Sequence, residues 1–162
     1  MIITKPKNSE QLKQSLHGVH SVFLVVCGEC ATTCKTGGIP ELEAAKKAFE
    51  QDGKTVKGWC IPSAPCVASQ IKTELAKNTK GVKDSDAIIV FACGLGVQSV
   101  KASNRSKAVV IAALDTVCSA LMNAQGDFIE TCSSCGDCLL SQTGGICPVT
   151  LCAKGLLNGP CG

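Results

Sequence analysis

The sequence predicts an α/β domain built on a small, mostly parallel sheet, followed by a cysteine-rich tail. Short, continuously apolar runs alternate with amphipathic segments through most of the chain, which is the pattern of parallel β-α units. Residues 131–162 contain six Cys, six Gly and two Pro, too little apolar material for a core, so this tail needs metal to fold. We therefore expect an α/β domain over 1–128 and a cluster-bearing segment over 129–162.

The first β-α unit follows a short polar start. Residues 22–26 are all apolar, as expected for a strand buried on both faces of a parallel sheet, and the strand ends at Cys27. Over 40–51 apolar residues recur at helical spacing among Glu and Lys, and Gly53 then supplies a stop signal.

The same alternation repeats along the chain. Pro62 and Pro65 separate the second strand from the second helix, and the third strand ends in Cys93 followed by Gly94. This order predicts a right-handed, mostly parallel sheet of the Rossmann or flavodoxin-like type. The expected strands are 55–61, 86–92 and 108–114, and the expected helices are 67–77 and 97–102.

The first cysteine group is Cys27, Cys30 and Cys34, with Cys93 as its distant partner. In open α/β sheets, ligands lie beyond the carboxyl ends of the strands, and Cys27 and Cys93 each follow a predicted strand. Iron-sulfur cubanes take four Cys thiolates, often three from a compact loop and one from elsewhere. These four residues are therefore predicted to hold a [4Fe-4S] cluster.

The second group lies in the tail. Cys132, Cys135 and Cys138 have the two-residue spacing of a bacterial ferredoxin triplet, and Cys147 is followed by Pro148 as in such runs. We expect these thiols to hold a second [4Fe-4S] cluster. Spacing does not choose the fourth ligand, although Cys152 has the central place. The candidates are Cys152, Cys147 and Cys161.

Zinc is the rival metal, because it also accepts four cysteines, although it more often uses paired C-x2-C knuckles than triplets. The alternative cofactor content is thus one [4Fe-4S] cluster and one zinc ion. Cys60, Cys66 and Cys118 stand singly in or near apolar segments and are interpreted as unliganded thiols. Cys66 is the best exception, because it follows Pro65 near a strand end.

Composition argues against several other classes of protein. The longest apolar runs are far shorter than the roughly 20 residues of a membrane helix, and the polar, Lys-bearing start does not look like a signal peptide. Lys and Arg are spread along the chain without interleaved aromatic residues, which argues against nucleic-acid binding. We expect a cytoplasmic protein whose 13 cysteines stay reduced.

Five phrases of the sequence are characteristic in combination. They are Cys27-Gly-Glu-Cys-Ala-Thr-Thr-Cys34, Ala92-Cys-Gly-Leu-Gly-Val-Gln98, Cys132-Ser-Ser-Cys-Gly-Asp-Cys138, Thr143-Gly-Gly-Ile-Cys-Pro-Val-Thr150 and Cys152-Ala-Lys-Gly-Leu-Leu-Asn-Gly-Pro-Cys161. With these phrases the chain resembles, over nearly its whole length, the MetV-type iron-sulfur small subunit of methylenetetrahydrofolate reductase.

The resemblance implies that Cys27, Cys30, Cys34 and Cys93 form one cluster site and that the C-terminal cysteines form another. It implies a MetF-type catalytic partner, which carries FMN and reduces methylenetetrahydrofolate to methyltetrahydrofolate in the reductive acetyl-CoA pathway of acetogenesis. This chain would be a non-catalytic electron-transfer subunit that feeds the partner's flavin, supplied by a further electron-donating subunit or a ferredoxin. The alternative is a structural docking subunit, with zinc or iron-sulfur sites and no relay role.

Overall fold

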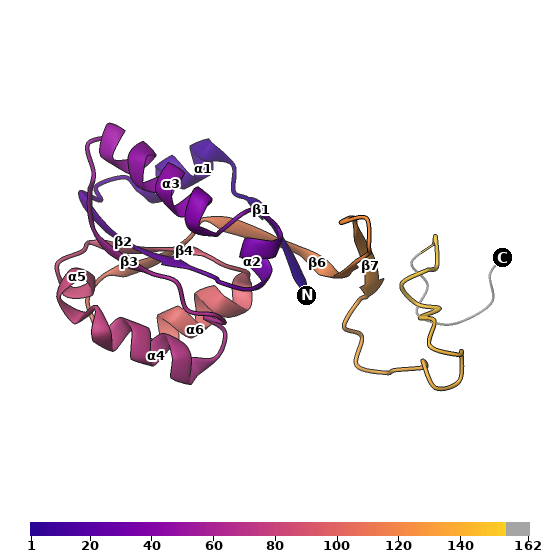
Figure 1. The fold of residues 1–162 in the computed structure, drawn as a ribbon. Helices are drawn as coiled ribbons and strands as arrows, with labels where there is room; N and C mark the ends of the chain where they lie inside the picture. The colour runs from indigo at the N-terminus through magenta and orange to yellow at the C-terminus, as the bar shows by residue number, and fades with distance from the viewer. Residues whose placement is uncertain (155–162) are drawn as a thin grey trace. The chain divides into compact units, whose positions relative to one another are not determined.

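The computed structural model describes residues 1–154 and divides the chain into two compact units. Unit 1 comprises Met1–Ile3 and Val117–Gly162, and unit 2 comprises Thr4–Thr116. Figure 1 shows the elements of both units. The sequence predicts a boundary between residues 128 and 129, because the segment after it carries the second cysteine group. That boundary stays a prediction.

Unit 2 is built on a four-stranded parallel sheet in the order β3-β2-β4-β5. The central strands β2 and β4 are buried along nearly their whole length, because their apolar side chains face helices on both sides of the sheet. The predicted alternation of parallel strands and helices is confirmed. The strands are β2 (Ser21–Val26), β3 (Thr55–Cys60), β4 (Ala87–Phe91) and β5 (Val109–Ala112).

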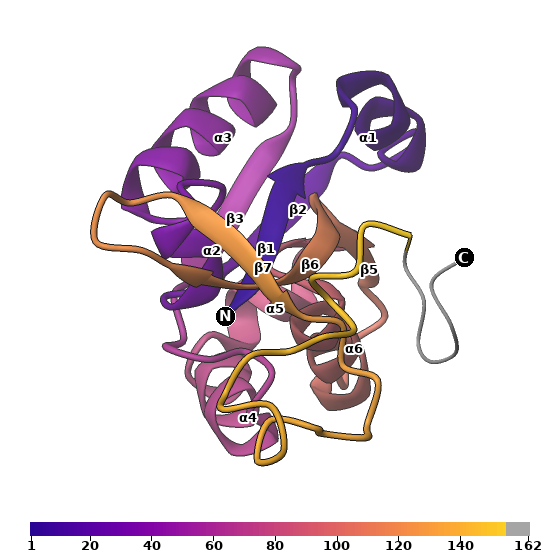
Figure 2. The ribbon, with the colours of Figure 1, turned by 90° about the vertical axis from the view of Figure 1, so that its right-hand side faces the viewer.

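Helices cover both faces of this sheet. In Figures 1 and 2, α1 and α3 lie on one side of the strands, and α4, α5 and α6 lie on the other. No helix within residues 1–154 is long and apolar enough to cross a membrane. The helices are α1 (Ser9–Ser15), α2 (Cys30–Thr33), α3 (Ile39–Gln51), α4 (Ala68–Lys77), α5 (Thr79–Lys83) and α6 (Gly94–Ser103).

The strand order creates a topological switch point between β2 and β4. From β2 the chain moves outward to β3, then returns past β2 to form β4 on its other side. The connections on the two sides of this point run over opposite faces of the sheet, which leaves a crevice at the carboxyl ends of β2 and β4. The register pairs Val26 with Phe91 at these ends.

Sequence patterns missed six elements, which are β1 (Ile2–Pro6), α1, α2, α5, β6 (Leu114–Met122) and β7 (Phe128–Cys132). A second sheet has the order β1-β6-β7, with β6 and β7 antiparallel. Its strands are half-exposed and mix polar with apolar residues, so they lack the apolar run that identified β2 and β4. The run at 108–114 forms β5, and β6 starts at its last residue.

A matched pair of valines tests the importance of the central strands. Val90 on β4 is fully buried, whereas Val109 on β5 is 59% exposed. We expect Val90→Ala to lower the free energy of unfolding by about 2 kcal/mol, because it removes two buried methyl groups and leaves a cavity. Val109→Ala should change it by less than about 0.5 kcal/mol. Urea unfolding compares the two variants, and equal losses would contradict the assigned burial.

Asp86 makes stability depend on pH. Its carboxylate accepts hydrogen bonds from the backbone N–H groups of His20 and Ser21 and from the Ser21 hydroxyl, and these bonds hold the pKa of Asp86 below its usual value. The lowered pKa means that ionised Asp86 stabilises the fold above the unfolded-state pKa of about 3.9 and that this contribution is lost on acidification.

We therefore expect Asp86→Asn to lower the thermal midpoint at pH 6, and the gap from the wild-type protein to shrink towards pH 2. The exposed Glu43 of α3 offers a control as Glu43→Gln. A gap of constant size across this range would show that ionisation of Asp86 does not contribute.

Candidate metal centres

Cys27 and Cys93 lie at neighbouring strand ends, at the switch point of the sheet. The backbone N–H of Cys27 donates to the carbonyl of Phe91, the last residue of β4, at 3.0 Å. Cys93 follows two residues later and is the N-cap residue of α6. Both cysteines are more than nine-tenths buried. The fold therefore brings together two residues that are 66 positions apart in the sequence.

Cys30 and Cys34 begin and cap the short helix α2. The N–H of Cys34 donates to the carbonyl of Cys30 at 2.9 Å, so the three-residue spacing places the two cysteines one helical turn apart, on the same side of α2. Both residues are half-buried. The spacing thus has a local structural reason.

The loop after Cys34 turns back over β4. The N–H groups of Thr36 and Gly37 both donate to the carbonyl of Ala31, and a Cβ on Gly37 would lie 3.1 Å from the Phe91 carbonyl oxygen. A larger residue would push the loop away from the strand end. Gly37 thus holds the cysteine loop against the strand that leads to Cys93.

Opposing effects act on negative charge at these cysteines. Because α6 begins directly after Cys93, the positive end of its dipole lies beside this residue, and the N–H of Gly94 there donates to the Thr116 hydroxyl at 2.9 Å. Burial raises the pKa of the Cys27 thiol, and nearby backbone N–H groups offset part of this effect. The thiolate form of Cys27 is thus disfavoured in the metal-free protein, and a bound cation would reverse that preference.

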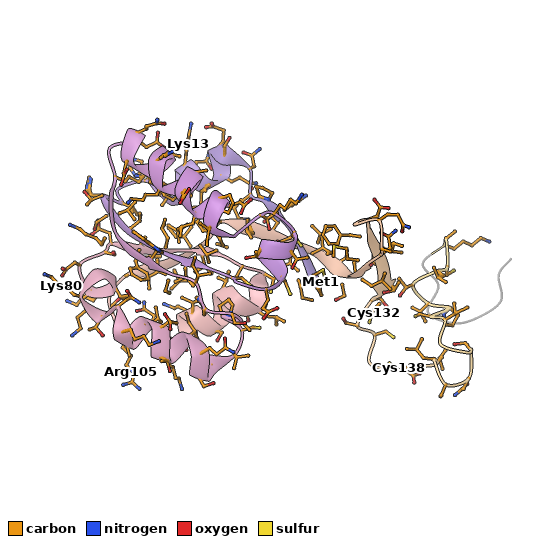
Figure 3. The ribbon with its side chains drawn as sticks, in the orientation of Figure 1. Met1, Lys13, Lys80, Arg105, Cys132 and Cys138 are labelled. Atoms are coloured by element: carbon orange, nitrogen blue, oxygen red, sulfur yellow. The ribbon has the colours of Figure 1, made fainter. Side chains whose placement is uncertain are left out.

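The second cysteine group lines a small cavity of about 90 Å³ in unit 1. Cys132 is the last residue of β7, and the chain then turns through positive φ angles at Ser134 and Gly136. The segment 139–149 folds back, so Cys147 also contributes to the lining. Figure 3 shows Cys132 and Cys138 on this part of the chain. The cysteines of the lining are Cys132, Cys135, Cys138 and Cys147.

The three candidates for the fourth ligand differ in position. The Cys147 sulfur lies 3.5 Å from the Thr150 hydroxyl, and hydrogen bonding from Thr150 lowers the pKa of Cys147, which favours the thiolate that a metal requires. Cys152 is not part of the cavity lining, and Cys161 lies outside the described residues.

The donor chemistry of both groups fits an iron-sulfur cluster, since each supplies at least three thiols from adjoining segments. Within residues 1–154, no three Cys, His, Asp or Glu side chains form a group that could hold a metal ion as they stand. A tetrahedral zinc site needs its four sulfurs about 4 Å apart, given Zn–S bonds of about 2.3 Å. A cubane binds each thiolate through a separate iron, so its four cysteine sulfurs lie farther apart than those of a zinc site.

The three single cysteines have different surroundings. Cys60 is buried at the end of β3, and Cys118 lies half-buried on β6. Cys66 is exposed and follows Pro65, whose ring would lie 3.3 Å from a Cβ on Gly96 of α6. Cys66 therefore lies at the same edge of the sheet as Cys93.

Sequence reasoning missed an apolar rim beside the first cysteine group, defined here as Ile39, Val67 and Leu95. These side chains are 62%, 42% and 59% exposed. Each follows a cysteine by no more than five residues and lies at the start of a helix that begins at the carboxyl end of the sheet. The sequence does contain a sign of this rim. An apolar residue follows each of Cys34, Cys66 and Cys93 within five positions, where a solvent-exposed loop would be polar.

Burial predicts the order in which two of these thiols react. The pKa of Cys60 is raised to about 12, mainly by burial and secondarily by the charge of Glu74, so only about one molecule in ten thousand carries its thiolate at pH 8. We expect iodoacetamide at pH 8 to modify exposed Cys66 well before Cys60, as followed by peptide mass spectrometry. Faster labelling of Cys60 would contradict its buried position.

Comparison with known proteins concerns the second cysteine group. Residues 111–162 match a protein-family model described as "Methylene-tetrahydrofolate reductase C terminal". The matched region is about a third of the chain and includes β6, β7 and the cavity with its four cysteines. No curated protein and no solved structure matches the chain. The last third of the chain is therefore similar to the C-terminal region of methylenetetrahydrofolate reductase.

Proposed function

We propose that this protein is an iron-sulfur electron-transfer subunit that passes electrons to a flavin-containing, MetF-type catalytic subunit of methylenetetrahydrofolate reductase. The observation that carries the proposal is that Cys27 and Cys93 follow the neighbouring strands β2 and β4 at the switch point of the sheet. Ligand sites in sheets of this kind lie at that crevice, and the residues found there are thiols.

In the first site, Cys27, Cys30, Cys34 and Cys93 would be the ligands, and a bound cluster supplies one-electron redox chemistry. Cys27 and Cys93 are fixed by the strand ends, while Cys30 and Cys34 are fixed one turn apart by α2. The positive end of the α6 dipole would stabilise negative charge beside Cys93. The chain thus supplies ligands from two rigid segments.

In the second site, we propose Cys147 as the fourth ligand beside Cys132, Cys135 and Cys138. The cavity that these residues line and the lowered pKa of Cys147 both support this choice. The following Pro148 fits the Cys-Pro ending of ferredoxin runs. Cys152 was favoured by sequence only for its central place, and it does not line the cavity.

Two observations support a protein partner. The family similar to residues 111–162 is described as part of methylenetetrahydrofolate reductase, an activity that needs a reductant for its substrate. The apolar rim of Ile39, Val67 and Leu95 is exposed beside the first cysteine group, where an electron-transfer partner would exclude water from the site. A flavin in the catalytic subunit would collect two electrons delivered singly.

The proposal is tested by metal and acid-labile sulfide analysis of protein purified without oxygen. We expect about eight irons and eight sulfides per chain, visible absorbance that bleaches with dithionite, and reduction of the flavin when the reduced chain is mixed with the MetF-type flavoprotein. Zinc alone would overturn the proposal. Four irons with one zinc, and no electron transfer to the flavin, would favour the structural docking subunit.

Cysteine variants separate the two sites. Cys27→Ser and Cys132→Ser should each lose about half of the iron, because each removes a ligand from one of two clusters. Cys118→Ser is the matched control and should keep all of it. Cys147→Ser should lose as much iron as Cys132→Ser, whereas Cys152→Ser should lose none. The reverse result for the last pair would make Cys152 the fourth ligand.

A further inference from the structure

We infer that unit 2 carries a further ligand site at the amino ends of the parallel strands, opposite the end that carries the cysteines. The site is a cationic groove that binds an organic anion with an apolar portion. The groove has a volume of about 520 Å³, within the range of small-molecule sites. Its walls are α4, α5 and the turn that follows α6. The lining residues that carry the argument are Lys72, Leu75, Val82, Lys83, Arg105 and Ser106.

Cations from three separate segments meet at this groove. Lys72 comes from α4, Lys83 from α5, and Arg105 from the turn before β5. None of the ten lining residues is acidic, and the three ion pairs within residues 1–154 involve other cations. Lys72, Lys83 and Arg105 therefore have no carboxylate partner in this part of the chain.

The local charge is large relative to the whole chain. Residues 72–84 and 101–107 contain seven Lys or Arg and two acidic residues, a formal charge of +5, whereas the whole chain carries +3. Figure 3 shows Lys80 and Arg105 extending outward from unit 2. Cations in the last turn of a helix also complement its dipole, which explains Lys77, Lys80, Lys83 and Lys101. It does not explain Lys72 or Arg105.

The wall that holds Arg105 is pre-organised. The Asn104 side chain donates to the carbonyl of Ala108 at 2.9 Å and accepts from the backbone N–H and the hydroxyl of Ser106. The Ser106 hydroxyl in turn accepts from the N–H of Ala108. These bonds close a tight turn around Arg105, so less conformational freedom is lost when a ligand binds.

The floor of the groove determines the class of ligand. Leu75 and Val82 are more than nine-tenths buried and form an apolar base below the exposed cations. An inorganic ion would use the cations alone, whereas an organic anion also covers the apolar base. Carboxylate and phosphate groups both pair well with Lys and Arg, so the shared chemistry is an organic carboxylate or phosphate.

Binding is tested on the full chain by isothermal titration with ATP and, separately, with benzene-1,3,5-tricarboxylate, at 50 and 300 mM KCl. We expect at least one of the two to bind, and its affinity to fall in the higher salt because exposed charges are screened. Binding of ATP alone would identify a phosphate-bearing ligand, and binding of the tricarboxylate alone a carboxylate. Failure of both to bind would overturn the inference.

Variants assign the binding to the groove. Lys83→Ala with Arg105→Ala should weaken the bound probe by about tenfold or more, since two charge-assisted contacts are lost. The matched control is Lys5→Ala with Lys47→Ala, which removes two exposed cations outside the groove. Equal weakening in both double variants would show that net charge, and not the groove, binds the anion. Circular dichroism checks that both variants are folded.

Discussion

The parallel pairing of β2 with β4 is the constraint on which the rest of unit 2 depends. Their register runs from Val22 with Ala87 to Val26 with Phe91, and both strands are buried on both faces. A slip of one residue would turn every side chain of a strand to the opposite face. The register also decides which residues follow the two strands at neighbouring positions. These are Cys27 after β2 and the segment that leads to Cys93 after β4.

The proposed cluster chemistry follows from this arrangement. Buried thiols cannot ionise readily, as the raised pKa of Cys27 indicates, so the thiolate that a metal requires would be favoured at this strand end only when a cation binds there. Cys60 ends the neighbouring strand β3 and is buried without an adjoining cysteine triplet. The difference between these strand ends lies in the loop of Cys30 and Cys34, which only β2 possesses.

Sequence patterns predicted all four strands of the parallel sheet, most accurately the fully buried ones, and missed the strands of the second sheet. β2 and β4 were predicted within one residue of their observed ends because their apolar runs are continuous. β1, β6 and β7 were missed because tertiary pairing, and not local pattern, makes them strands. The positions of Cys27 and Cys93 at neighbouring strand ends followed from the strand pattern, whereas the place of Cys147 in the cavity depends on how 139–149 folds back. Lys72 and Arg105 are 33 positions apart, and only the packing of α4 against α6 brings them to one groove.

The cysteine group and the cationic groove occupy opposite edges of one sheet, and this separation has a physical consequence. β4 has five residues, so its ends are about 17 Å apart. Exposed charges at that distance are largely screened at physiological ionic strength, where the Debye length is about 8 Å. Removing Lys83 and Arg105 should therefore leave the cysteines' metal content unchanged, and removing Cys27 should leave anion binding unchanged. The two tests are therefore independent, because no residue of the groove belongs to the cysteine group.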